Sequence, residues 1–257
     1  MPIYGYLLVL GGAAASVLVL LVLSRYVPGE KREPHNDVLG FVYAVVGVIY
    51  AVVLALVVIG LWETQEKARA DTYTESDALI DLYWYGRSLP PADAARIEDL
   101  AQRYPHTVIT EEWPLLAQHR SSRKAWDEQA ELRQAVYRQQ PKTLGEQARY
   151  QQALQAVSTM SDTRRQRVNE SAAGLPSLLW AVLVLGGLIT VAFAMGFGMH
   201  SLRAHSLIVF GAALTVGSLL LCIYELNYPF VRSIRVNPDA FELAIARMKA
   251  LSAMSPR

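Results

Sequence analysis

The residues that most often carry catalysis or bind metals are few and scattered in this chain. The five histidines have no spacing that suits a helical ligand pair or a proton relay; they are His35, His106, His119, His200 and His205. The sequence contains no phosphate-cradling glycine loop and no Gly-x-Ser-x-Gly motif. The single cysteine, Cys222, cannot form an intramolecular disulfide. We therefore predict no enzymatic activity, no catalytic residue, no metal site and no cofactor.

The polar run His35-Asn36-Asp37 directly precedes a long apolar stretch. A histidine beside an aspartate is compatible with a metal or proton site, but no further ligand is nearby. Asn36 or Asp37 is instead well placed to cap the following helix, because these side chains accept hydrogen bonds from free N–H groups at a helix start. An acidic group there also favours the helix dipole. We predict the helix cap.

Three arginines stand close together in Arg164-Arg165-Gln166-Arg167, shortly before another apolar stretch. One interpretation is a solvated helix face that contacts lipid headgroups. The other is a vestibule that attracts anions. We expect the first, and the second stays open.

Four uncharged stretches are long enough to cross a bilayer as helices. They cover residues 3–24, 38–62, 171–199 (helical from about Leu178) and 206–224. A spanning helix needs about 20 apolar residues. Although 18% of the residues are charged, none of the charges falls in these stretches. The sequence predicts an all-α membrane protein with four transmembrane helices. The first should be retained, because no Lys or Arg precedes it and its apolar run is too long for a signal peptide.

The second stretch is followed by good helix formers without Gly or Pro, so we expect its helix to continue beyond the membrane. One of its faces has small residues at spacings of three and four, namely Ala44, Gly47, Ala51 and Ala55. Such a face lets another helix approach closely. The other side carries Ile49, Val53 and Leu56. Either the branched face meets lipid, as in ordinary packing, or one face lines a pore. If the branched face lines it, these three residues form the neck.

The region between the second and third spans is predicted to be a helical bundle, because it is poor in Val, Ile and Gly. We expect helices over residues 69–85, 92–104 and 113–139, an irregular segment at 105–114, and a long helix opened by the capping box Thr143-Leu144-Gly145-Glu146. The predicted domains are residues 1–63 (spans one and two), 64–170 (helical bundle), 171–225 (spans three and four) and 226–257 (tail).

An even number of spans puts both termini and the helical bundle on one side of the membrane. That side has more Lys and Arg near the membrane than the two short loops, so the positive-inside rule places it in the cytoplasm. We expect a multi-pass protein of a bacterial inner membrane, in contact with lipids. The formal net charge of +1 argues against a nucleic-acid partner.

The segment after the last span, Glu225-Leu226-Asn227-Tyr228-Pro229-Phe230, has two interpretations. In the first it is an interfacial helix end, where Tyr228 anchors at the headgroups, Pro229 stops the helix and Asp239 later starts another. It also resembles the post-transmembrane motif of bestrophins, in which Asn-Pro-Phe or Asp-Pro-Phe precedes an acidic run and a Phe-Glu pair. The matching residues are Asn227, Pro229 and Phe230.

Over nearly its full length the chain more closely resembles the bacterial bestrophin-like family of membrane proteins. The resemblance rests on His35-Asn36-Asp37, Gly47-Val48-Ile49-Tyr50-Ala51, Trp62-Glu63, the segment from Glu75 to Leu82, and Pro229-Phe230 with Pro238. Bestrophins are pentameric ion channels with four membrane helices per subunit and an apolar neck on the second helix. The resemblance therefore implies a homo-oligomer, a pentamer, that conducts inorganic ions. Where bestrophins with a calcium clasp are acidic after Pro-Phe, this chain has Val231-Arg232-Ser233-Ile234-Arg235, which argues against calcium gating there.

A second hypothesis is a non-conducting membrane sensor or scaffold that acts through its helical cytoplasmic domain. A secondary transporter is disfavoured, because no broken helix or ionisable residue is visible within a span. The sequence leaves the permeant ion open: Arg164, Arg165 and Arg167 would favour anions, whereas Glu63 would favour cations.

Overall fold

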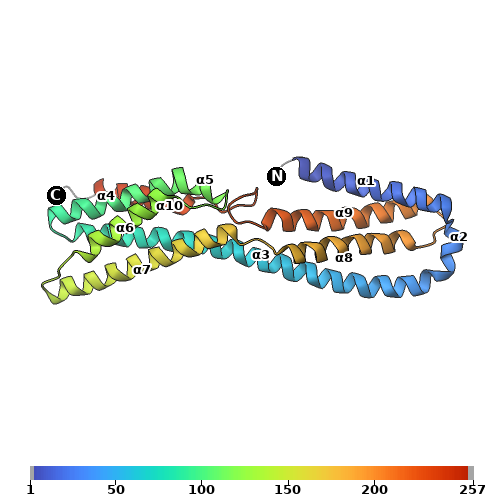
Figure 1. Ribbon diagram of the computed structural model, residues 1–257, viewed down its shortest axis with the longest axis horizontal. Coiled ribbons are helices and arrows are strands. Elements are labelled where there is room, and N and C mark those ends of the chain that lie inside the picture. The colour runs from blue at the N-terminus through green and yellow to red at the C-terminus, as the bar shows by residue number, and fades with distance from the viewer. Residues whose placement is uncertain (1–2, 254–257) are drawn as a thin grey trace. The chain divides into compact units, whose positions relative to one another are not determined.

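The computed structural model describes residues 3–253, and nearly all of this range is helical (Figure 1). No strand occurs within the described residues. The chain divides into two compact units. The membrane unit contains residues 3–63, 174–227 and 232–234, and the bundle unit contains residues 64–173, 228–231 and 235–253. The predicted all-helical class is confirmed.

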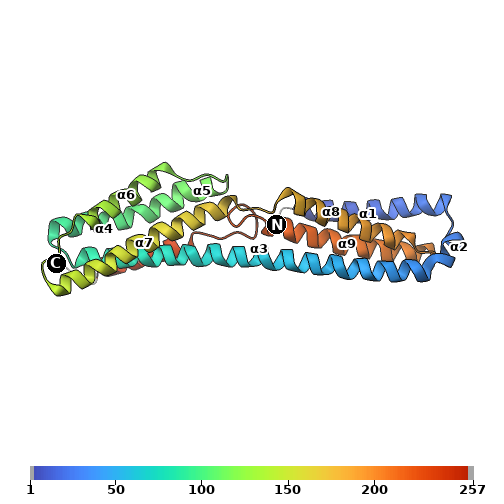
Figure 2. The ribbon, with the colours of Figure 1, turned by 60° about the horizontal axis from the view of Figure 1, so that its bottom comes forward.

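Within the described residues, four helices are long and apolar enough to cross a membrane, as predicted. They are α1 (Ile3–Tyr26), the first part of α3 (Asn36–Arg87), α8 (Ser177–Gly196) and α9 (Leu202–Leu226); α2 (Gly29–Arg32) and a 3₁₀ turn (Glu33–His35) join α1 to α3. The α9 helix packs against both α1 and α8 (Figure 1 and Figure 2). Large apolar side chains point outward from these helices, which suits a surface that faces lipid.

Two adjacent glycines let α8 approach α3 closely. A Cβ atom at Gly186 would lie 2.6 Å from Tyr50 Cδ2, and one at Gly187 would lie 2.9 Å from Tyr50 Oη. The Tyr50 hydroxyl donates a hydrogen bond of 2.9 Å to the carbonyl of Leu183. The surrounding apolar cluster contains Tyr50, Leu54, Leu61, Leu183, Ile223 and Leu226. Small residues and an interhelical hydrogen bond are thus the main devices that fix this contact.

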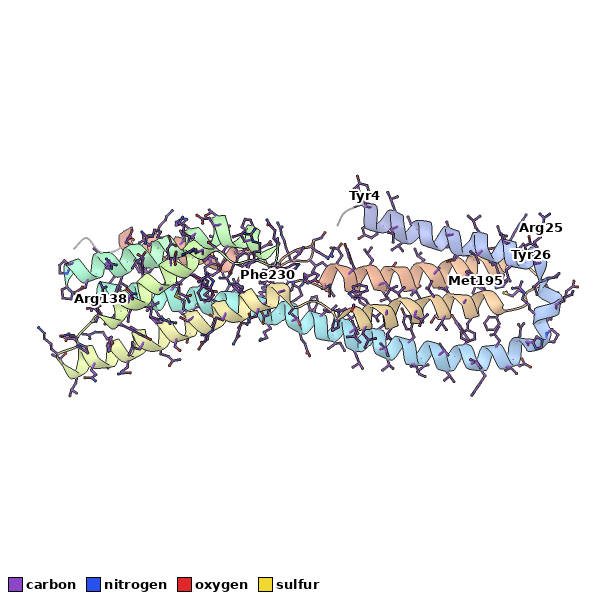
Figure 3. All side chains as sticks on the ribbon, in the orientation of Figure 1. Tyr4, Arg25, Tyr26, Arg138, Met195 and Phe230 are labelled. Carbon is purple, nitrogen blue, oxygen red and sulfur yellow. The ribbon has the colours of Figure 1, made fainter. Side chains whose placement is uncertain are left out.

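One end of the membrane unit is held by the side chain of Arg32. Its Nη1 donates to the carbonyl of Met195 at 2.6 Å, and its Nη2 donates to the Ser24 hydroxyl at 3.1 Å. Figure 3 shows Met195 near the end of α8, at the same end of the unit as Arg25 and Tyr26. The arginine therefore ties the connection between α1 and α3 to the end of α8.

The bundle unit is built from the second part of α3 and further helices. These are α4 (Pro91–Thr107), a π-helical turn (Val108–Glu112), α5 (Trp113–Leu116), α6 (Arg123–Tyr137), α7 (Leu144–Ala172) and α10 (Asp239–Ala253). The capping box at Thr143 and Glu146 is confirmed: each residue's side chain accepts from the other's backbone N–H. The core includes Leu79, Leu82, Ile97, Leu100, Leu132 and Val136.

Two predictions for this unit are wrong. The expected irregular segment at 105–114 is helical, because α4 continues through Pro105 and a π-helical turn follows. The expected single helix over 113–139 is interrupted after Leu116. The interruption includes His119, whose φ of 58° is left-handed, and ends at Ser122, whose hydroxyl caps α6. A left-handed residue interrupts an α-helix, and a serine N-cap marks the start of a new one, so α5 and α6 are separate helices.

Candidate functional site

One face of α3 is buried from Tyr50 to Leu82. The buried residues are Tyr50, Leu54, Leu61, Gln65, Ala68, Thr72, Glu75, Leu79 and Leu82. They follow one another at spacings of three, four or seven, which keeps them on the same side of an α-helix. Within the membrane unit, the opposite side of the helix carries exposed apolar residues, among them Val48, Val52 and Ile59.

The predicted neck residues lie at the edge of this exposed side. Ile49 is 60% exposed and Leu56 is 65% exposed, whereas Val53 is half-buried and packs against the apolar cluster around Tyr50. Val53 therefore lies on the packed side of α3, whereas Ile49 and Leu56 are exposed.

Among the described residues, no other helix covers the predicted small-residue face. Ala44, Ala51 and Ala55 are exposed, and Gly47 is half-buried, with open space where a Cβ atom would lie and no neighbouring atom within 4 Å of that point. The helix contact within the chain uses instead the face with Tyr50. Sequence reasoning missed this face because it ranked small residues above a tyrosine whose hydroxyl finds a partner on α8.

A buried charge cluster lies in the bundle unit, formed by Glu75, Glu112, Arg164 and Arg167, all of them 0% exposed. Glu112 ends the π-helical turn, and its carboxylate accepts four hydrogen bonds. Its Oε1 accepts from Arg164 Nε at 3.2 Å and from Arg167 Nη2 at 3.0 Å. Its Oε2 accepts from Arg164 Nη2 at 2.5 Å and from the backbone N–H of Ser122 at 3.2 Å.

Glu75 brings α3 into the same cluster. Its Oε2 accepts from Arg167 Nε at 2.9 Å, and its Oε1 accepts from Arg167 Nη2 at 3.0 Å. The Tyr104 hydroxyl of α4 also donates to Oε1, at 2.5 Å. Arg167 therefore bridges a carboxylate on α3 and a carboxylate on the π-helical turn, while α4 contributes the tyrosine.

Aromatic rings enclose the two guanidinium groups. Arg164 lies over Trp126, 4.2 Å from the ring centroid, and Arg167 lies 5.4 Å from the centroids of Trp113 and Phe241. These contacts stabilise buried cations, since an aromatic face attracts positive charge. Arg167 Nη1 is buried without a hydrogen-bond partner within the described part of the chain.

The charges of the cluster balance, and this shapes its acid–base properties. Burial alone would raise the pKa of the Glu112 carboxyl, but the guanidiniums of Arg167 and Arg164 hold it below its ordinary value. Burial, reinforced by the nearby Glu75 carboxylate, raises the pKa of Tyr104 well above its usual range. The cluster is therefore an ionic lock of two carboxylates and two guanidiniums, with the tyrosine as a neutral donor.

This cluster corrects both interpretations of the run from Arg164 to Arg167. Arg164 and Arg167 are neither a solvated face nor the lining of an open vestibule, because their side chains are fully buried in ion pairs. Only Arg165 is exposed, and it pairs with Asp162. The spacing of three between Arg164 and Arg167 was a usable signal, since it places both on one face of α7.

The segment after α9 is anchored in each unit separately. In the membrane unit, Asn227 Oδ1 accepts from the backbone N–H of Leu175 at 2.7 Å. In the bundle unit, the Phe230 ring is 1% exposed and meets Trp113 edge to face at 5.4 Å. The Tyr228 ring lies 4.6 Å from the ring of His119, and its expected role as a headgroup anchor stays a prediction. The Pro229 carbonyl accepts from Val236 N at 2.8 Å, which closes the turn after α9.

Asn36 does not cap α3 through its side chain. Its backbone is already helical, with φ −59° and ψ −38°, because the 3₁₀ turn runs straight into the helix. Its amide instead exchanges two hydrogen bonds of 2.8 Å with the backbone of Gly198. Asp37 stays in the first turn, where its charge suits the helix dipole.

Fold and site define a class: an all-helical membrane protein with four spans, a helical bundle between spans two and three, and an ordered segment after the last span. The chain matches the model of the Bestrophin-like domain over residues 10–241. It therefore belongs to the Bestrophin-like family. A search of the curated proteins found no significant match.

Similar solved structures include two crystal structures of a bacterial bestrophin homologue from Klebsiella pneumoniae, each with one substitution. One is 13% identical, with 97% of this chain and 98% of that chain covered and a TM-score of 0.67. The other is 12% identical, with 98% of each chain covered and a TM-score of 0.68. At this identity the likeness shows the shared fold, and the fold implied by the family resemblance is confirmed.

Proposed function

We propose that the protein is a homo-oligomeric, bestrophin-like ion channel and that the oligomer is a pentamer. In this assembly the α3 helices of the subunits surround the central axis. The observation that carries this proposal is the asymmetry of α3. One side packs on its own chain, and the opposite side is apolar and uncovered across the whole span. The family membership and the bestrophin-like fold support the same assembly.

The neck lies on the side of α3 that faces away from α8 and α9. The centre of this side carries Val48, Val52 and Ile59, which are 65%, 53% and 54% exposed. Ile49 and Leu56 stand at its edge, and Val53 belongs to the packed side. Apolar constrictions gate by dewetting, so an apolar neck is compatible with conduction.

Adjacent residues on α3 offer a matched test of this assignment. Val52→Ser should raise single-channel conductance in a planar bilayer, because a hydroxyl in the neck favours water. Val53→Ser introduces the same group one residue away, on the side packed against the chain, and should leave conductance near that of the native protein. If Val53→Ser raised the conductance and Val52→Ser did not, the pore would lie on the packed side of α3, and the proposed position of the neck would be wrong.

The small residues of α3 are proposed to contact the neighbouring subunit. Ala44, Gly47, Ala51 and Ala55 flank the proposed neck and, within residues 3–253, are not packed against another helix. A smooth helix face allows close approach of a second helix. Ala51→Leu should therefore weaken the oligomer in size-exclusion chromatography, whereas an unchanged elution volume would remove this face from the interface.

The proposed location is a bacterial inner membrane, with lipids around the spans and the bundle unit and both termini in the cytoplasm. The excess of Lys and Arg near the membrane on that side supports this orientation. An alkaline phosphatase fused after residue 257 should be inactive in cells, because the enzyme needs the periplasm. An active fusion would reverse the topology.

The decisive experiment is ion flux from liposomes that contain the purified protein. A channel should release a salt gradient, and particles in projection should show fivefold symmetry. Tight vesicles with correctly inserted oligomers would instead support a non-conducting sensor or scaffold that acts through the bundle unit. Twofold particles would count against the channel.

A further inference from the structure

A groove of about 640 Å³ lies between α1, α8 and α9 in the membrane unit. Small-molecule sites have volumes of about 300–1,000 Å³. Leu8 and Leu188, two of the residues that line the groove, are 76% and 64% exposed, so the groove opens on the outer surface of the unit. All three helices are long and apolar enough to cross a membrane. The groove is therefore surrounded by lipid rather than by water.

Glycines shape both the walls and the space of this groove. A Cβ atom at Gly5 of α1 would lie 3.0 Å from Leu221 Cδ1 of α9. A Cβ atom at Gly217 of α9 would lie 3.1 Å from Val9 Cγ1 of α1. At Gly12, which also lines the groove, nothing lies within 4 Å of an added Cβ atom. The helices thus touch at Gly5 and Gly217 and leave open space beside Gly12.

The groove is about as long as one leaflet of a bilayer is deep. On α1 its lining extends from Tyr4 to Ser16, and on α9 it extends from Ala213 to Glu225. At about 1.5 Å per helical residue, each stretch is about 18 Å long. The hydrocarbon core of a bilayer is about 30 Å thick, so one leaflet contributes about 15 Å. An acyl chain that enters at the Tyr4 end can therefore lie along the whole groove.

This end of the groove carries side chains that suit the boundary between membrane and water. Tyr4 is 82% exposed there (Figure 3), and the Tyr224 ring lies 6.4 Å from the ring of Trp180 on α8. Tyrosine and tryptophan are enriched at the level of lipid headgroups. Arg232, which follows α9 in the membrane unit, holds its guanidinium carbon 3.3 Å from the centroid of the Tyr224 ring. Its Nε is buried and has no hydrogen-bond partner within residues 3–253.

The acidic residue at this end, Glu225, is engaged with the backbone. Glu225 is 2% exposed, and its Oε2 accepts from the backbone N–H of Ser233 at 3.1 Å. This hydrogen bond fixes the residue next to Arg232, whose own side chain stays partly exposed. A guanidinium binds phosphate oxygens well, because its N–H groups form paired, charge-assisted hydrogen bonds. The mouth of the groove therefore presents a fixed cation with a free donor.

We propose that this groove binds a phospholipid, with one acyl chain between α1, α8 and α9 and with the headgroup phosphate paired to Arg232. The chain matches the apolar lining and the length of the groove, and the phosphate supplies the acceptor that Arg232 Nε lacks. The site is independent of conduction, because none of these three helices is proposed to line the pore. Absence of ion flux would overturn the channel and leave the lipid site standing.

Native mass spectrometry of the detergent-solubilised protein with added phosphatidylglycerol tests this site. The native protein should retain one lipid per subunit. Gly12→Leu fills the open space and should abolish retention, and Arg232→Gln removes the phosphate partner and should weaken binding about tenfold. Gly11→Leu is the matched control, because Gly11 also has nothing within 4 Å of an added Cβ atom but does not line the groove. It should retain lipid as the native protein does.

Three results would overturn the proposal. The first is equal retention of lipid by the native protein, Gly12→Leu and Arg232→Gln, or equal loss in Gly11→Leu and Gly12→Leu. The second is a smaller oligomer in Gly12→Leu without loss of lipid, which would show that a second copy of the chain covers the groove. The third is displacement of the lipid by an equal concentration of inorganic phosphate, which would show that the acyl chain contributes nothing.

A second measurement uses the native chain and needs no variant. Phosphatidylglycerol with a photoreactive diazirine on one acyl chain is added and irradiated, and the labelled peptides are identified by mass spectrometry. The label should fall on groove residues of α1 and α9, such as Gly12 and Val216. Label confined to the exposed side of α3 would contradict the site.

Discussion

The two units of this protein differ in the contacts that join their helices. In the membrane unit, the contact of α3 with α8 consists of glycines, aliphatic residues and one tyrosine hydroxyl. In the bundle unit, the centre holds two arginines and two glutamates with no exposed surface. The unit with the more apolar sequence thus depends on close fit, whereas the more polar unit encloses an ionic lock.

This difference follows from what surrounds each unit. Next to lipid, outward apolar side chains cost little, so the helices are held by van der Waals packing and a few polar contacts. Next to water, the bundle gains stability from apolar burial. A buried charge in that setting is tolerated only when partners compensate its desolvation. The units should therefore fail through different kinds of substitution.

The largest effect is expected when the ionic lock loses its bridging cation. Arg167→Met leaves the buried Glu75 carboxylate without a cation, while Glu112 keeps Arg164, and should lower the free energy of unfolding by about 3–5 kcal/mol. Denaturation of the detergent-solubilised protein, followed by circular dichroism, measures this. Adding Glu75→Gln should recover part of the loss, because it removes the stranded charge.

The neighbouring Arg165 provides the control, since its side chain is 61% exposed and pairs with Asp162 at the surface. Arg165→Met should change stability by less than about 0.5 kcal/mol. Equal losses for the two arginines would show that the cluster is not the stabilising feature.

In the membrane unit, steric fit should matter more than charge. Gly186→Ala would place a methyl group 2.6 Å from Tyr50 Cδ2 and force α3 and α8 apart. We expect a loss of about 1–3 kcal/mol, measured as a lower midpoint in SDS titration. Gly211→Ala, on α9 with nothing within 4 Å of its added carbon, should be neutral or slightly stabilising. A loss of stability in both variants would indicate that these helices do not tolerate alanine at any glycine, whatever the space around it.

Acid should weaken the bundle unit through Glu112. Its folded pKa lies below the unfolded value of 4.5, so its contribution to stability is present above about that pH and is lost as the pH falls through the folded pKa. Each unit of difference corresponds to about 1.4 kcal/mol. The melting temperature of Glu112→Gln should therefore fall less between pH 5 and pH 3 than that of the native protein, although it starts lower. Parallel acid curves would contradict this.

The smallest effect is expected for the single polar contact between α3 and α8. Tyr50→Phe removes the hydrogen bond to the carbonyl of Leu183 and should cost about 0.6 kcal/mol in the same SDS titration. Tyr4, which is 82% exposed near the start of α1 (Figure 3), supplies the control. Tyr4→Phe should not move the midpoint of the titration. If Tyr4→Phe lowered the midpoint as much as Tyr50→Phe does, the loss could not be attributed to the interhelical hydrogen bond.

The sequence predicts those features that depend on neighbours in the chain. The four spans follow from uninterrupted apolar runs, the start of α7 follows from its capping box, and α10 begins at Asp239 as expected. The order of these helices in the complete fold was predicted from the family resemblance, which rests on short motifs along the chain.

The ionic lock could not be predicted in the same way. The partners of Arg164 and Arg167 lie 52 and 92 positions away, in Glu112 and Glu75. When only neighbouring residues are considered, arginines near a membrane span suggest contact with lipid headgroups or attraction of anions. Their burial depends on which side of α7 meets α3 and the π-helical turn, and that is a property of tertiary packing.

The packed side of α3 was also beyond local rules. Small residues suggest a helix contact, but Ala51 and Ala55 are uncovered and the contact uses Tyr50 instead. The informative signal was the spacing of buried residues continuing past the span through Ala68 and Leu82. A pattern that persists in both lipid and water identifies the side that meets protein.

The π-helical turn makes the bundle sensitive to chain length rather than to residue type. A π turn contains about one residue more than an α turn. Deleting Ile109 would restore α-helical phase and rotate Glu112 by about 100° relative to α4. The carboxylate would then leave both guanidiniums, although every residue of the ionic lock would still be present. Within this segment a one-residue deletion should therefore be more damaging than most substitutions, and relatives that keep the glutamate and both arginines should also keep the length of the turn.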